Sequence, residues 1–146
     1  MPSDRQILFQ DFSEVQKQAF LELGAPERHA VQTTVVKEGQ VGSEMLIVEE
    51  GILSVWVRDT KVNEVGVERV MGVSSLIEPH PRTVTLVAET EVGLLRFTRS
   101  RVLEHLETVS PKLFHAFFVN AFRIHVNLVR QCEERIVQSD HELNAM

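Results

Sequence analysis

The stretch from Met71 to Glu89, MGVSSLIEPHPRTVTLVAE, contains the residues best suited to binding chemistry. Arg82 and Thr83 lie directly before an apolar run that alternates as a β-strand does. A guanidinium at the edge of an apolar strand is costly unless an anion pairs with it, and its planar fork suits two phosphate oxygens. Thr83 adds a hydroxyl donor. We therefore expect Arg82 to hold either a ligand anion or a carboxylate of the chain, such as that of Glu78.

The segment before the arginine can add further donors. Gly72 opens a turn that contains Ser74 and Ser75, whose hydroxyl and backbone N–H groups can face an anion. If this turn is helical, its N-terminus favours negative charge. The sequence shows no nucleophile–base pair, no phosphate-binding P-loop and no catalytic carboxylate pair at convincing spacing. We therefore predict a binding protein that is not an enzyme and that needs no cofactor or metal.

The composition sets the class of protein. The 146 residues suit one domain, and 43% hydrophobic content can form a core. A net charge of −6 argues against a general nucleic-acid or anionic-membrane surface. The single cysteine excludes an intrachain disulfide and favours a reducing compartment, so we predict a cytoplasmic location. The start lacks a secretory signal, and no apolar run is long enough to span a membrane.

Three segments must position the candidate site. Residues 1–28 are predicted to be helical, with a capping box at Ser13 and Gln16. Residues 29–99 contain many short strands divided by glycine turns, which is typical of a sandwich or barrel. Residues 100–138 are predicted to form helices, the longer of which begins at Ser110 and Pro111 as cap and first residue. The chain is therefore predicted to be one α+β domain.

The long C-terminal helix has two apolar stripes. One has the 4-4-3-4-3-4 spacing of a coiled coil. Its members are Phe114, Phe118, Phe122, His125, Val129, Cys132 and Ile136. The second comprises Leu113, Phe117, Ile124 and Leu128. One stripe can pack on the β region while the other meets a partner, so we predict a homodimer. The alternative is a single wide face that packs only on its own domain.

Two motifs resemble a known family. KEGQVGSEMLIVEEGILSVWV is similar to the glycine-framed hairpins of the cyclic nucleotide-binding domain family, which includes catabolite activator-like sensor domains. The phosphate-binding cassette of that family reads approximately G-E-L-A-L, a short loop and P-R-[ST]-A-[ST]-V. Residues 72–76 and 81–86 align with it without a gap. The resemblance covers nearly the whole chain.

The resemblance implies a fold and a ligand. The expected fold is a β-roll of about eight strands, jelly-roll-like, flanked by N-terminal helices and the long C-terminal helix. The expected function is a regulatory sensor that binds a cyclic nucleotide or a related anion and signals through the final helix. The expected binding residues of the cassette are Gly72, Val73, Ser74, Ser75, Arg82 and Thr83. Because the base often contacts that helix in the family, Arg123 and Asn127 are further candidates.

Two positions depart from the family pattern. The alanine that follows the arginine and hydroxyl residue is replaced by Val84, which is bulkier. The cassette glutamate that holds the ribose 2′-hydroxyl is replaced by Val73, which has no acceptor. The resemblance therefore implies an anion site with a weakened ribose contact. A glutamate at position 73 is expected to strengthen cyclic nucleotide binding.

Two alternatives remain open at this point. A ligand-free interaction module would keep the fold and the dimer helix, and a haem-based sensor would use His125 or Cys132. The eight residues after Gln138 are too few for a helix-turn-helix, so no DNA-binding domain is expected in this chain.

Overall fold

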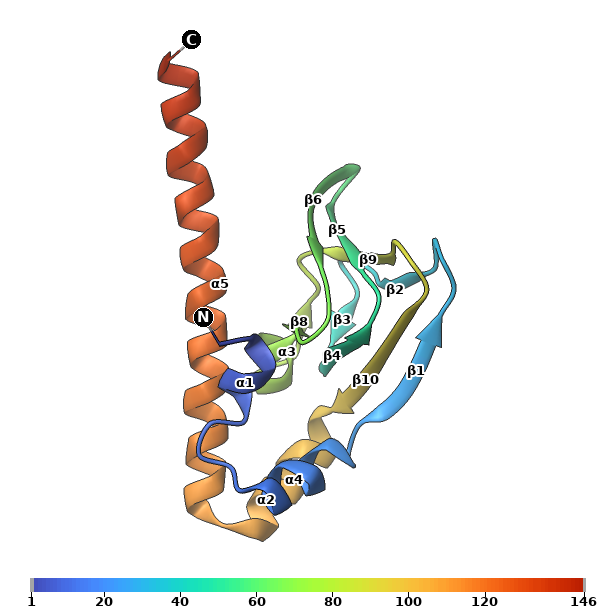
Figure 1. Ribbon diagram of the computed structural model, residues 1–146, viewed down its shortest axis with the longest axis vertical. Coiled ribbons are helices and arrows are strands. Elements are labelled where there is room, and N and C mark those ends of the chain that lie inside the picture. Colours follow the sequence, from blue (N-terminus) through green and yellow to red (C-terminus); the bar gives the residue numbers. More distant parts are fainter. Residues whose placement is uncertain (1, 146) are drawn as a thin grey trace.

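The computed structural model describes residues 2–145, with side chains described up to Gln131, and it confirms the α+β β-roll flanked by helices (Figure 1). The helices of these residues are α1 Asp4–Leu8, α2 Glu14–Leu21, α3 Val73–Ile77, α4 Arg99–Val109 and α5 Pro111–Ala145. The strands are β1 Ala25–His29, β2 Thr34–Val36, β3 Val41–Gly42, β4 Glu44–Glu50, β5 Leu53–Val57, β6 Thr60–Val65, β7 Val70–Met71, β8 His80–Pro81, β9 Thr85–Ala88 and β10 Val92–Thr98.

The roll consists of antiparallel sheets, and strands that follow one another in sequence often belong to different sheets. Within the described residues, one sheet has the order β1-β10-β4-β7, a second has the order β2-β9-β5-β6, and β3 pairs with β8. β4 and β5 are neighbours in sequence but belong to different sheets. The chain crosses between them at Gly51, where φ is +87° and an added Cβ would lie 2.2 Å from the Glu91 carbonyl oxygen. A glycine is therefore required at this crossing.

The β region begins earlier than the sequence predicted. β1 starts at Ala25, inside the segment 1–28 that was expected to be helical, and α2 already ends at Leu21. Pro26 is compatible with a strand here because β1 is an edge strand that pairs only with β10 in its sheet, among the residues described. The capping box at Ser13 and Gln16 is confirmed.

The two faces of β4 pack in opposite directions. Met45 and Ile47 belong to a core shared with the helices, whereas Leu46 and Val48 face the interior of the roll. Phe20, Phe97 and Phe117 are fully buried in the first core. Their rings lie 5.3 Å apart in each pair that includes Phe20. This packing fixes α2 and α5 against the sheet that contains β10.

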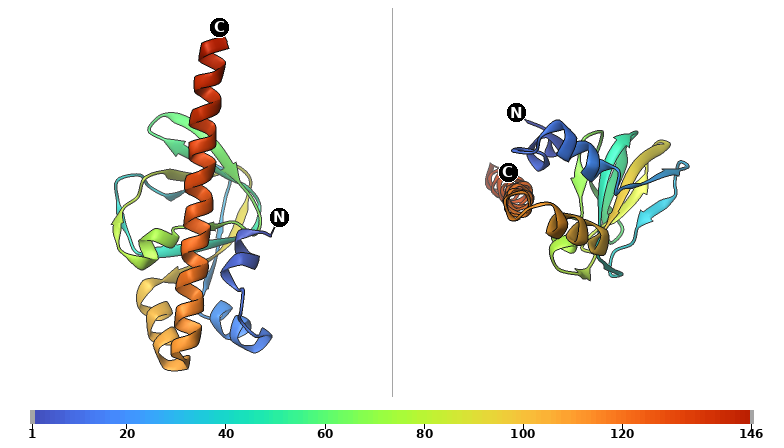
Figure 2. Two further views of the ribbon diagram at one scale, coloured as in Figure 1. Left: turned by 90° about the vertical axis from the view of Figure 1, so that its left-hand side faces the viewer. Right: turned by 90° about the horizontal axis from the view of Figure 1, so that it is seen from below.

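α5 stands beside the roll and extends past it (Figures 1 and 2). It begins at Pro111, where the Ser110 hydroxyl accepts a hydrogen bond from the backbone N–H of Leu113, and it continues to Ala145 instead of ending near Gln138. Phe117 is buried on the domain, whereas Phe122 is 63% exposed. The side chains of Cys132 and Ile136 lie outside the described part of the chain. No helix that the structure describes is long and apolar enough to cross a membrane.

Candidate ligand cavity

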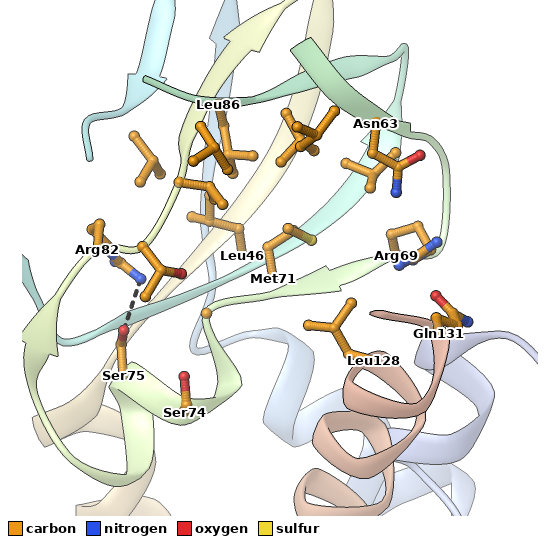
Figure 3. Close-up of a pocket in the computed structure, with 18 of the residues that line it drawn as sticks. Leu46, Asn63, Arg69, Met71, Ser74, Ser75, Arg82, Leu86, Leu128 and Gln131 are labelled. Atoms are coloured by element: carbon orange, nitrogen blue, oxygen red, sulfur yellow. Dashed lines mark hydrogen bonds between the residues drawn. The ribbon is translucent and has the colours of Figure 1, made fainter. Parts of the chain in front are cut away.

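A cavity of about 310 Å³ opens between the roll, α3 and α5 (Figure 3). This size is at the lower end of the range for small-molecule sites. Most of its wall is aliphatic and comes from the strands. The wall residues are Val36, Leu46, Val55, Val57, Val62, Val65, Met71, Val84 and Leu86. One end is polar, and its lining residues are Gly72, Ser74, Ser75, His80, Arg82 and Thr83.

Arg82 lies at the polar end, and its guanidinium packs against Gly42 and Gly72, which we call the glycine seat. Its Nη1 donates to the Ser75 hydroxyl at 3.1 Å and its Nη2 donates to the Glu44 carbonyl oxygen at 3.1 Å. A Cβ at Gly42 would lie 2.1 Å from Nε, and a Cβ at Gly72 would lie 2.9 Å from Nη1. Both positions must therefore lack a side chain for the guanidinium to reach the cavity in this way.

The charge of Arg82 has no ion-pair partner among the described residues, so the ion pair with Glu78 considered from the sequence is not formed. Burial lowers the pKa of Arg82. The negative charge of Glu44 opposes this shift, and the positive charge of Arg96 adds to it. An arginine keeps its proton even so. The cavity thus contains a partly desolvated positive charge that hydrogen bonds to neutral groups only.

His80 joins the polar end, although the sequence reasoning did not single it out. Its Nε2 lies 2.9 Å from the Ser74 hydroxyl and 3.3 Å from the Ser75 hydroxyl. Its Nδ1 donates to the Pro81 carbonyl oxygen at 2.8 Å. The signal that could have found it is its position two residues before Arg82, in the turn that brings the arginine back to the glycine seat.

Val73 does not face the cavity. It is 5% exposed and packs in the core shared with the helices. The next residue, Ser74, is the one that lines the polar end. A glutamate at position 73 would therefore enter the core instead of reaching a ribose. This placement argues against the expectation that such a substitution strengthens cyclic nucleotide binding.

The two polar candidates on α5 do not line the cavity. Arg123 Nη1 donates to Gln10 Oε1 at 2.8 Å, in a groove on another side of the helix. Asn127 lines a separate crevice of about 20 Å³. Of the α5 side chains described, those of Leu128 and Gln131 line the cavity (Figure 3). The second apolar stripe of α5 could have identified Leu128, because Leu128 lies four residues after the buried Ile124.

At the opposite end of the cavity, the positive charge is already paired with a carboxylate of the chain. Arg69 lines this end, and its Nε donates to Asp4 Oδ2 at 3.0 Å. Its charge is therefore neutralised by α1. Asn63 lies beside it at the rim (Figure 3). Among side chains described through Gln131, no carboxylate lines the cavity, and no group of three His, Cys, Asp or Glu could hold a metal ion.

Comparison with known protein families gives one match that covers more than half of the chain. Residues 27–109 match the cyclic nucleotide-binding domain. The match includes the glycine seat, α3, His80 and Arg82, and it ends with α4.

Solved structures share the fold at low sequence identity. A cyclic nucleotide-binding domain from Methylobacillus flagellatus aligns with a TM-score of 0.82 and 20% identity, over 91% of this chain and 80% of that chain. The N-terminal domain of a Streptomyces coelicolor transcriptional regulator aligns with a TM-score of 0.74 and 24% identity, over 91% and 93% of the two chains. The Thermus thermophilus catabolite activator protein aligns with a TM-score of 0.72 and 17% identity, over 92% and 62%.

Proposed function

The chain belongs to the cyclic nucleotide-binding domain family, and from that premise we propose that it is a regulatory module whose cavity binds a small anion. The observation that carries the proposal is Arg82, a partly buried guanidinium that faces a cavity and hydrogen bonds to no carboxylate. Exposed cations need no counterion, but a desolvated one is stabilised by an anion that the ligand can bring.

The cavity favours an anion with an apolar body. Aliphatic side chains cover most of the wall, whereas the donors of Ser75 and Arg82 gather at one end. A cyclic nucleotide satisfies this arrangement with its phosphate and base. Its ribose 2′-hydroxyl meets no carboxylate among the described lining residues, so cyclic AMP should bind about ten- to a hundredfold more weakly than at a site that has one.

The signal would pass through α5. Leu128 and Gln131 line the cavity, so a ligand that contacts them favours one position of the helix over others. On the apolar stripe of α5 that has coiled-coil spacing, Phe122 is 63% exposed and Val129 is 42% exposed. We propose that this stripe joins two copies of the chain in a homodimer, whose geometry then depends on the ligand.

Calorimetric titration of the wild type and Arg82→Leu tests the anion site. Cyclic AMP, cyclic GMP, inorganic sulfate and benzoate are the probes. Loss of two charged hydrogen bonds should weaken binding by at least about a hundredfold. Arg101→Leu, which removes an exposed arginine of α4, is the matched control. Equal affinity in Arg82→Leu and the wild type contradicts the proposal. If none of the probes binds the wild type, a ligand-free interaction module is the better account.

Light scattering tests the assembly. Replacing Phe122 and Val129 by glutamate puts repelling charges into the proposed seam and should give monomers. Arg130→Glu adds a carboxylate to the same helix off the stripe and should leave the dimer intact. A folded wild-type monomer at about tens of micromolar, a concentration at which stable dimers with Kd near 1 μM are formed, would exclude this arrangement.

A further inference from the structure

The hydrogen bonds of His80 fix where its protons lie. The Pro81 carbonyl oxygen can only accept, so Nδ1 must carry a proton. In the neutral imidazole Nε2 is then an acceptor, and the Ser74 hydroxyl donates to it at 2.9 Å. The neutral form of His80 thus turns the Ser74 proton toward the ring and away from a ligand.

Ser75 connects Arg82 to the same ring nitrogen. Its oxygen accepts from Arg82 Nη1 and lies 3.3 Å from His80 Nε2. Nε2 of the neutral ring has one lone pair, and Ser74, at the shorter distance, is the serine that donates to it. While the ring is neutral, the Ser74 hydroxyl therefore offers no free proton to an anion at the polar end.

Protonation reverses the direction of donation at Ser74. A charged imidazole has a proton on both ring nitrogens, so Nε2 donates to the Ser74 oxygen and the Ser74 hydroxyl is free to donate to a ligand. It also places a second positive charge beside the one on Arg82. We propose that His80 is a positioning residue of the anion site, which acts through Ser74 and takes up a proton when an anion binds. The inference rests on the proposed anion-binding function.

The charged groups around His80 explain why proton uptake needs the anion. From its own loop, Arg82 reaches the shared Ser75 and repels a charged ring. Glu44 on β4 contributes only its carbonyl to this network, because its carboxylate binds Arg96. β3, which pairs with the strand of His80, comprises Val41 and Gly42 and brings no charge.

Two further charged groups lie near the C-terminal end of α3. Glu78 follows the helix and is exposed, and Arg99 donates to the Ile77 carbonyl oxygen at 3.5 Å, at the end of α3 away from Ser74. No carboxylate of the described side chains hydrogen bonds to His80. A bound anion would therefore be the group that offsets the charge of the protonated ring.

The experiment measures anion affinity against pH. Cyclic AMP and inorganic sulfate are the probes, because neither titrates between about pH 5.5 and about pH 8, whereas a phosphomonoester has a second pKa of about 6. If the anion raises the pKa of a histidine by about one unit, affinity falls about tenfold across this interval. Wild-type affinity should fall in this way, and that of His80→Gln should not. His115→Gln, on the exposed part of α5, should follow the wild type.

Proton uptake gives a second readout that needs no variant. Titrations of the wild type in two buffers of different ionisation enthalpy should show up to one proton taken up for each anion bound near neutral pH. Zero uptake, or a His80→Gln profile that follows the wild type, overturns the inference. The anion-binding function survives that result if Arg82→Leu still abolishes binding. No binding of either probe at either pH overturns both.

Discussion

Arg82 and Arg96 both reach Glu44, but they use different atoms of it. Arg96 binds the Glu44 carboxylate and also donates from Nε to Glu27 Oε2 at 2.6 Å. Arg82 contacts Glu44 only at its backbone carbonyl oxygen, to which Nη2 donates. Burial lowers the pKa of both guanidiniums. For Arg96 the hydrogen bonds to two carboxylates outweigh burial and raise its pKa, whereas for Arg82 burial prevails.

The difference separates a cation whose counterions come from the chain from one that has no counterion among the described residues. The chain supplies the counterions of Arg96, which joins β1, β4 and β10. It supplies none to Arg82 among the described residues, yet it builds a seat for Arg82 from Gly42 and Gly72. These two glycines leave the space that the guanidinium occupies at the end of the cavity. The comparison therefore supports the proposal that a ligand completes the site.

The largest effect is expected from Val73→Glu. This substitution adds a carboxylate next to the cavity-lining Ser74, but at a position that faces the core. Val73 is 5% exposed in an apolar core, so the glutamate must be buried. The free energy of unfolding should fall by about 3 kcal/mol or more at neutral pH. Urea denaturation measures this change, and Val73→Leu should cost less than about 1.5 kcal/mol. Wild-type stability together with tighter cyclic AMP binding would show that residue 73 faces the cavity.

Ser75→Asp should give Arg82 an ion-pair partner within the chain, as Arg96 has. The Ser75 hydroxyl already accepts from Arg82 Nη1, so an aspartate there supplies the missing counterion. The ligand anion then loses a charged hydrogen bond and meets a like charge, and affinity should fall about ten- to a hundredfold. Ser75→Asn has the same size without the charge and should lose less. Equal sulfate affinities of these two variants by calorimetry would argue against a role for charge.

Arg96→Leu and Arg82→Leu should differ in stability. The first removes the ion-pair partner of Glu44 and leaves the partly buried carboxylate of Glu27 with His29 alone, and we expect a loss of about 1–2 kcal/mol after allowing for their partial exposure. The second removes a desolvated charge that has no ion pair, and should change stability by less than about 1 kcal/mol. Denaturant midpoints at equal slope measure both. A larger loss in Arg82→Leu would make Arg82 the structural arginine.

The smallest effect is in acid. The hydrogen bond from Arg96 holds the pKa of Glu27 below its usual range, burial opposes this shift, and His29 adds to it. A lowered carboxyl pKa stabilises the fold above the usual value of about 4.3, and this contribution is lost as pH falls through the lowered pKa. Below about pH 4, the wild type should therefore lose stability that Arg96→Leu never had. Parallel acid profiles of the two proteins would contradict the assignment.

The sequence was informative where one residue type has one common use. Glycine turns and alternating strands predicted a sandwich or barrel, and the cap at Ser110 predicted the start of α5. The resemblance to the family cassette added the roll and the binding role of Arg82, which lines the cavity. The sequence was misleading at β1, because Pro26 indicates a break unless the edge position of the strand is known.

The rest of the site depends on directions that spacing cannot show. Val73 and Ser74 are adjacent, yet one enters the core and the other lines the cavity. The five-residue helix α3 sets this choice through its packing against the roll. On α5, Asn127 and Leu128 are likewise adjacent, yet Leu128 lines the cavity whereas Asn127 lines only the small crevice beside it. A family motif locates such a segment, but an alignment shifted by one residue selects the wrong side chain.

The pairing of β1 with β10 has a consequence for synthesis. Ala25 lies opposite Arg96, so the first strand leaves the ribosome long before its partner and the roll cannot close until Thr98 has emerged. During that interval β1 is an unpaired edge. Its sequence, APERH, combines a proline with charged side chains, which are the features that discourage an open strand from pairing with other chains. The residues that tolerate the edge in the finished fold thus also protect the nascent chain.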